Sequence, residues 1–242
     1  MKVSRQESLA QPFVLTGADL ERLSLRLRNL ANRISFEIEC KDKLKREFAT
    51  LQELLDFENP PSKEIQSLRI MASSEDLNTR IWLKLENDTA RNIFVSIEGD
   101  ESAALSANDS LEEIFSAIRP WYSRLSRTDF YLVLTIILMT PLLVLLLGMA
   151  LGLVKINPNE PFSLQAALPG IVRGSLIGIA PLVFGAMLNR VKRTLFPIGV
   201  FAIGQGAKRH KDKEIIRTLV VVAFFVSLAS SVLATSLFAF WR

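Results

Sequence analysis

Residues 130–154 read FYLVLTIILMTPLLVLLLGMALGLV and contain no Asp, Glu, Lys or Arg. As a helix rising about 1.5 Å per residue, this stretch exceeds the roughly 30 Å hydrocarbon core of a bilayer. Residues 218–241 are also free of these charges and predict a second membrane helix over about 216–241. Helices of soluble cores rarely have such long apolar runs. The chain is therefore predicted to be an integral membrane protein.

A third apolar region, residues 166–189, decides the topology. It is rich in Gly and Pro and is interrupted by Arg173. If it crosses the membrane, the basic residues before residue 130 and those of 190–217 share one side, as the positive-inside rule requires. Otherwise it re-enters, because the part after Arg173 alone is too short to cross. Arg173 itself either snorkels to the interface or takes part in gating.

The predicted membrane part is therefore a helical domain over 129–242, with three spans or with two spans and a re-entrant segment. We expect a multi-pass protein of the cell (inner) membrane with a cytoplasmic N-terminus and an external C-terminus. No signal peptide opens the chain, since its first residues are polar. The lipid bilayer is the first expected partner.

Residues 1–128 carry charges every few positions and predict a water-facing domain. Thr16 and Asp19 are spaced as a capping box ahead of a helix with leucines at helical spacing. A second capping box is predicted at Asp109 and Glu112, starting another helix. These helices are expected to cover one face of a sheet.

Apolar residues alternate with polar ones in four segments of this domain, which is the period of a half-buried strand. The segments are centred on residues 34–40, 68–70, 81–85 and 93–97. Short polar connections between the last three predict an antiparallel meander. We therefore expect a two-layer α+β domain with an antiparallel sheet of about four strands.

The sequence offers no chemistry for catalysis. It has one histidine, His210, and one cysteine, Cys40, and it lacks a P-loop, a nucleophile elbow and a dinucleotide-binding motif. We expect no enzyme activity, no metal and no cofactor. The net charge of +4 is explained by basic residues flanking the spans, so no nucleic-acid partner is predicted.

Trp82 and Phe94 stand at the alternate positions of neighbouring predicted strands that are otherwise polar. Both side chains should therefore project from the face opposite the core. They predict either a contact patch for a cytosolic protein or small ligand, or simple cross-strand packing.

Small residues recur at every fourth position in the apolar regions, a spacing that lets two membrane helices approach closely. We expect a homo-oligomer packed through these stripes. The stripe residues are Gly148, Gly152, Gly170, Gly174, Gly178, Ala223, Ser227, Ser231 and Thr235.

Residues 194–206 are apolar, too short to span and flanked by basic residues, which predicts a segment lying along the membrane interface. The basic residues after it are expected to bind anionic lipid or phosphate: Lys208, Arg209, Lys211 and Lys213. Two alternatives remain for Gly204 to Gly206, an anion-binding nest and the glycine-terminated end of an interfacial helix.

Two functions fit this architecture. In the first, a cytoplasmic sensor or interaction domain controls a small helical pore, channel or membrane-perturbing effector in an oligomer, by analogy in bacterial stress or antiviral defence. In the second, a membrane-anchored adaptor recruits a cytosolic partner without transport. Buried acidic residues are absent from the predicted spans, which argues against a proton-coupled transporter.

Overall fold

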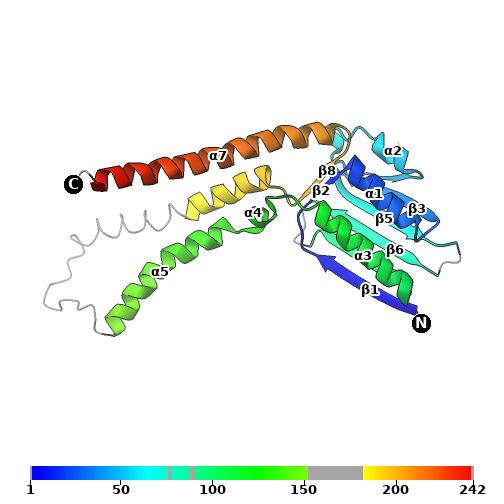
Figure 1. The fold of residues 1–242 in the computed structure, drawn as a ribbon, viewed down its shortest axis with the longest axis horizontal. Helices are drawn as coiled ribbons and strands as arrows, with labels where there is room; N and C mark the ends of the chain where they lie inside the picture. The colour runs from blue at the N-terminus through cyan, green and yellow to red at the C-terminus, as the bar shows by residue number, and fades with distance from the viewer. Residues whose placement is uncertain (1, 76–77, 88–90, 152–181, 241–242) are drawn as a thin grey trace. The chain divides into compact units, whose positions relative to one another are not determined.

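The computed structural model describes residues 2–75, 78–87, 91–151 and 182–240 (Figure 1). Contacts between Cα atoms divide the chain into two compact units. The first joins Met1–Ser126 to Leu195–Arg242, and the second is Arg127–Thr194. The end of the first segment at Ser126 lies close to the domain boundary predicted after residue 128. The prediction did not include the return of the chain to the first unit at Leu195.

Six antiparallel strands form the main sheet, in the spatial order β1-β7-β6-β5-β3-β4. They are β1 (Lys2–Leu9), β3 (Arg33–Cys40), β4 (Lys45–Phe48), β5 (Ile65–Ser73), β6 (Arg80–Glu86) and β7 (Ile93–Asp100). The α+β class and the antiparallel sheet are confirmed. The four strands expected from alternation are the inner four, and the two edge strands were not predicted because their side chains are mostly polar or charged.

Each inner strand has one buried face and one open face. In β6, Ile81, Leu83 and Leu85 are buried, whereas Trp82 and Lys84 lie between them on the other side of the sheet. Apolar residues of β3, β5 and β7 extend the same buried layer. The open face therefore carries the polar phase of the strands, together with Trp82 and Phe94, as predicted for these two residues.

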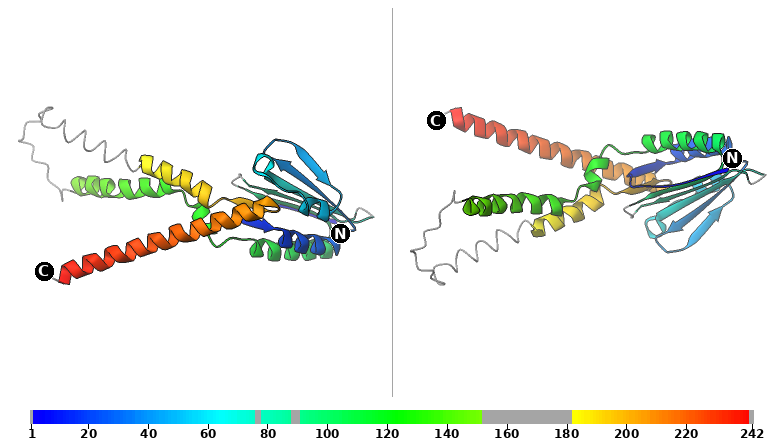
Figure 2. Two further views of the ribbon diagram at one scale, coloured as in Figure 1. Left: turned by 90° about the horizontal axis from the view of Figure 1, so that it is seen from above. Right: turned by 90° about the horizontal axis from the view of Figure 1, so that it is seen from below.

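Helices α1 (Gly17–Arg28) and α3 (Glu101–Ala117) cover one face of the sheet, as both views of Figure 2 show. The capping box predicted for α1 is confirmed: the Thr16 hydroxyl accepts from the Asp19 N–H, and the Asp19 carboxylate accepts from the Thr16 N–H. The capping box predicted at Asp109 is wrong, because α3 already begins at Glu101. The residues before Asp109 are mainly small, so they carry no large apolar stripe, yet Ala104 and Ala107 are buried.

Short elements connect these layers. They are α2 (Leu51–Leu55), the 3-10 turn η1 (Pro61–Lys63) and α4 (Ser123–Arg127). The Thr50 hydroxyl caps α2 by accepting from the Glu53 N–H. The chain then leaves the domain through α4.

A second, two-stranded sheet brings together distant parts of the first unit. Its strands β2 (Phe13–Thr16) and β8 (Gly199–Ala202) are parallel. Phe201, Ala202 and Ile203 are buried in the domain, and the rings of Phe13 and Phe201 meet edge to face at 5.4 Å. Residues 199–203 therefore do not lie along a membrane interface as predicted; they belong to the sheet domain.

The second unit contains α5 (Phe130–Ala150) and nearly all of a helix over 182–195. The side chain of Asn189 joins them, because its Oδ1 accepts from the Phe130 N–H at 3.0 Å and its Nδ2 donates to the Asp129 carboxylate at 2.7 Å. The Asn189 amide lowers the pKa of Asp129. Residues 152–181 lie outside the described residues, so most of the predicted span 166–189 does as well.

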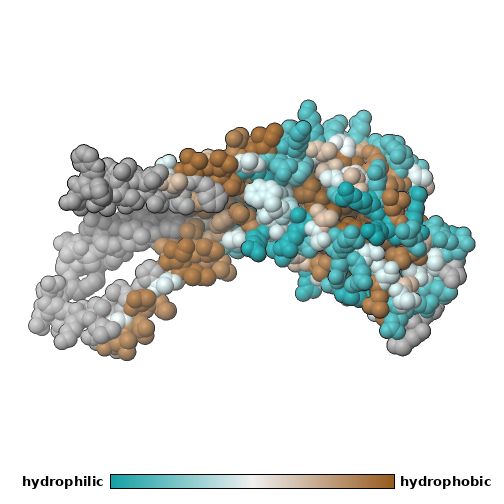
Figure 3. Space-filling view, in the orientation of Figure 1, coloured by the Kyte–Doolittle hydropathy of each residue, from teal (hydrophilic) through white to brown (hydrophobic). Residues whose placement is uncertain are grey.

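Helix α7 (Gln205–Phe240) has 36 residues, about 54 Å at 1.5 Å per residue. Its first turns are polar, and the charge-free part from Thr218 to Phe240 is as long as a bilayer core is thick. Within the described parts of the chain, α7 holds the one helix long and apolar enough to cross a membrane. Hydrophobic side chains cover the described surface of α5 and of this part of α7 (Figure 3).

Candidate functional site: the junction between the sheet domain and α7

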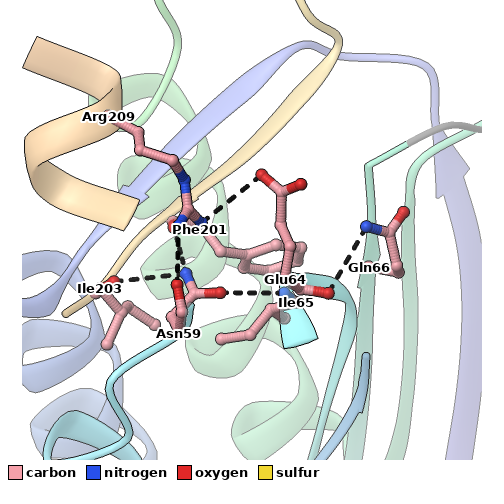
Figure 4. A network of polar contacts seen from close by, with 7 residues as sticks. All are labelled: Asn59, Glu64, Ile65, Gln66, Phe201, Ile203 and Arg209. Atoms are coloured by element: carbon pink, nitrogen blue, oxygen red, sulfur yellow. Dashed lines mark hydrogen bonds and ion pairs between the residues drawn. The ribbon is translucent and has the colours of Figure 1, made fainter. Parts of the chain in front are cut away.

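Asn59 ties β8 to the sheet domain from a buried position (Figure 4). Its Nδ2 donates to the carbonyl oxygens of Phe201 at 3.1 Å and Ile203 at 3.2 Å, and its Oδ1 accepts from the Ile65 N–H at 3.0 Å. The backbone of Asn59 has φ 48°, a left-handed conformation that asparagine tolerates better than most residues. Both ends of the side-chain amide are thus satisfied, and they hold β5 and β8 together.

Two glycines let α7 start against the backbone around Asn59. Gly204 has φ +51°, and a Cβ at this position would lie 2.5 Å from the Glu58 carbonyl oxygen. A Cβ on Gly206 would lie 2.5 Å from both the Asn59 Nδ2 and the Phe201 carbonyl oxygen. No larger residue fits either position without moving backbone or the Asn59 amide.

The backbone amides at the start of α7 are already used inside the protein. Gln205 donates to the Glu58 carbonyl at 2.7 Å, Gly206 to Ile203 at 2.9 Å and Ala207 to Gly204 at 3.1 Å. The alternative of an anion-binding nest at residues 204–206 is therefore wrong, because such a nest needs free N–H groups.

The predicted basic cluster separates into two parts. Arg209 lies against the sheet domain, where its Nη1 donates to the Asn59 carbonyl at 2.9 Å and its Nη2 lies 3.6 Å from the Glu64 carboxylate (Figure 4). Lys208, Lys211 and Lys213 are exposed. Anionic lipid remains a prediction for these three lysines, whereas Arg209 reinforces the Asn59 junction.

A second attachment lies at Arg217, just before the charge-free part of α7. Arg217 is fully buried, and its Nε donates to the Leu195 carbonyl. The guanidinium carbon stands 4.7 Å from the centre of the Tyr122 ring, a cation–π distance. In the part of the chain that the structure describes, the Arg217 Nη1 and Nη2 and the Tyr122 hydroxyl have no hydrogen-bond partner.

Aromatic rings surround this arginine. Tyr122 packs on Phe196 with 5.5 Å between centroids, and Trp121 lies 5.7 Å from Tyr122 and 6.4 Å from Phe196. Burial raises the pKa of Tyr122, against the opposing effect of the Arg217 charge. The phenol is therefore neutral at ordinary pH and offers Arg217 the face of its ring rather than an anion.

His210 lies two helical turns before Arg217, on the polar part of α7. Its Nε2 is 3.7 Å from the Glu214 carboxylate, and its buried Nδ1 has no hydrogen-bond partner among the described residues. Burial lowers the pKa of His210, the Arg217 and Lys213 charges lower it further, and Glu214 opposes them.

The other predicted site residues are not part of the contacts described above. On the open face, the Trp82 ring lies 5.9 Å from the Arg69 guanidinium carbon and lines two hollows of about 640 and 580 Å³, the second shared with Phe94. Ala223, Ser227 and Ser231 are exposed on α7; Thr235 is in the helix. Gly148 lies in α5, whereas the remaining glycines and Arg173 lie outside the described residues.

No family model matches the chain, and neither does any curated protein or solved structure. Among the described residues, no group of three or more His, Cys, Asp or Glu side chains is arranged to hold a metal ion. Asn59, Tyr122 and Arg217 were not predicted as site residues. The sequence signal for Arg217 is its position as the last charged residue before a membrane-length apolar run. The sequence signal for Asn59 is only that it begins an Asn-Pro-Pro turn.

Proposed function

We propose that this protein is an oligomeric membrane protein in which the cytoplasmic α+β domain senses a cytosolic protein or small ligand and controls a small helical pore or membrane-perturbing effector. The observation that carries the proposal is the continuity of α7. One helix starts on β8 and Asn59 and runs on to Phe240. A helix of this length transmits a displacement of the sheet domain directly into its apolar part.

The return of β8 to the sheet domain supports the three-span topology. The chain leaves the first unit after Ser126 and rejoins it at Leu195, shortly before β8. A chain that leaves and returns to one side of a membrane crosses it an even number of times. If α5 crosses outward, the apolar region 166–189 therefore crosses back, and α7 crosses outward again with an external C-terminus.

Cysteine labelling in intact cells tests this topology. A membrane-impermeant maleimide should not reach Lys211→Cys from outside, whereas it should reach a cysteine introduced at Asn159 in the predicted external loop. The native Cys40 is buried and serves as the background control. External labelling at residue 211 would contradict the three-span topology.

Ion flux through purified protein in liposomes tests the proposed activity. We expect flux above the lipid background, and we expect Asn59→Asp to alter it because the new carboxylate faces two carbonyl oxygens and releases β8. Asn92→Asp is the matched control. Asn92 is equally buried, but its side-chain amide hydrogen-bonds the backbone of Gln11 within the sheet domain instead of the backbone of β8.

The open sheet face favours a second candidate, the membrane-anchored adaptor. Trp82, Phe94 and Met71 lie on this face; Met71 is 42% exposed, and Trp82 and Phe94 are half-buried. An adaptor needs such a docking surface and no conducting path. Liposomes that show no flux above background, with or without cytosol, would support the adaptor and contradict the pore.

A further inference from the structure

The two edges of the main sheet differ in how they are protected. β4 is a four-residue strand that carries Lys45, Arg46 and Glu47. β1 has eight residues, contains no proline, and among the described residues pairs with a strand, β7, on one side only. A long regular edge presents a row of free N–H and C=O groups and is a template for another strand.

The register of β1 on β7 fixes which side chains share a face. Arg5 is opposite Ile97 and Glu7 is opposite Val95, both on the face that the helices cover. Gln6 is opposite Ser96 on the open face. Two copies of β1 can extend the sheet about a two-fold axis normal to it. The helix-covered faces of the two subunits must then lie on the same side. This requires that one residue of β1 directly faces its own copy across the axis.

Among the registers centred on Arg5, Gln6 and Glu7, charge favours the one centred on Gln6. If Arg5 lies at the axis, the two Arg5 side chains face each other and repel. If Glu7 lies at the axis, the two Glu7 carboxylates face each other and also repel. With the axis at Gln6, each Arg5 faces Glu7 of the partner subunit and each Val3 faces Leu9 of the partner subunit. Arg5 and Glu7 are 2.8 Å apart within one chain and remain partly exposed, at 46% and 37%, so both are accessible to a partner.

We propose that β1 is a homodimer interface, in which two copies of this chain pair antiparallel through β1 with Gln6 on the two-fold axis. The pairing covers the long edge and makes one continuous sheet from two subunits. It uses a surface of the sheet domain and does not depend on pore activity or on the stripes of the membrane helices.

Disulfide crosslinking of the full-length protein in membranes tests the register. Directly opposed residues in an antiparallel pair have Cβ atoms about 4.5–5.5 Å apart, within reach of a disulfide after a small adjustment. Gln6→Cys should form a linked dimer on oxidation. Ser4→Cys and Ser8→Cys should each fail alone and should crosslink when the two variants are mixed, because Ser4 faces Ser8 of the partner subunit.

Charge reversal gives an independent readout. In the Gln6→Cys background, Glu7→Arg should lower the crosslinked fraction about tenfold, because two attractive pairs become repulsive. Adding Arg5→Glu should restore it, which a merely damaged strand would not do. Equal crosslinking of the three single cysteine variants, or a yield unchanged by charge reversal, would overturn the proposal. The absence of ion flux in liposomes would contradict the proposed pore but not the proposed β1 dimer.

Discussion

The sheet domain holds α7 at two places that differ in their chemistry. At Asn59 the side-chain amide is fully hydrogen-bonded, to Phe201, Ile203 and Ile65. At Arg217 a buried guanidinium has one hydrogen bond from Nε, while Nη1 and Nη2 have none among the described residues. A satisfied buried amide specifies one geometry, whereas a buried cation without a counter-charge is costly to keep. The first place fixes the helix start, and the second is where its attachment is weakest.

Gly204→Ala should produce the largest loss of stability. It forces alanine into φ +51° and brings a Cβ to 2.5 Å from a backbone oxygen, which together cost about 3 kcal/mol. The thermal midpoint of the full chain in detergent, followed by tryptophan fluorescence, should fall. Gly99→Ala is the control, since its Cβ would meet the movable Thr79 side chain at 3.3 Å. Equal midpoints for the two variants would contradict the tight approach at Glu58.

Arg217→Met should change stability in the opposite direction. Replacing a buried, poorly partnered charge by an apolar side chain of similar length stabilises by about 1–2 kcal/mol, because the desolvation cost disappears. The same fluorescence melt measures it. Arg217→Lys is the matched variant that keeps the charge but loses the planar stacking on Tyr122 and should destabilise. A melting temperature that falls with Arg217→Met would show that the guanidinium is better partnered than its geometry indicates.

The pKa of His210 should make this attachment sensitive to acid. Its folded pKa is lowered below 6.5, so in the window beneath 6.5 the unfolded chain binds more protons and stability falls as pH falls. Above about pH 6.5 the stability is fully present. His210→Gln should flatten the acid limb of a plot of unfolding free energy against pH while leaving the neutral region unchanged. An unchanged limb would assign the acid sensitivity to other groups.

The sequence predicted what local patterns encode. Alternation located β3, β5, β6 and β7, the Thr16 capping box located α1, and the missing charges located the apolar helices. It could not predict that β8 pairs with β2, because GVFA at 199–202 has no local signal for a strand partner near the other end of the chain. The same holds for Asn59 and Tyr122, whose partners are far along the sequence. The basic residues at the start of α7 predict lipid binding, but the Arg209 guanidinium donates to the Asn59 carbonyl instead.

The smallest effect is expected on the part of α7 beyond both attachments. Ser227 is exposed there, on the predicted stripe with Ala223 and Ser231. Hydrogen bonds between membrane helices average about 0.6 kcal/mol, so Ser227→Ala should leave the oligomer nearly unchanged. Ser227→Leu should reduce oligomer size, because a bulky side chain keeps a second backbone from approaching.

Size measurement in nanodiscs separates the two outcomes, with Val226→Leu as a control one position off the stripe. If Ser227→Ala and Ser227→Leu give the same oligomer, this face of α7 contacts lipid. Association would then rest on Gly148 of α5 or on the β1 edge. If Ser227→Leu alone dissociates the oligomer, helix packing adds an interface beyond both points of attachment. The sheet domain would then act on α7 at its fixed start, while neighbouring subunits act on its apolar part.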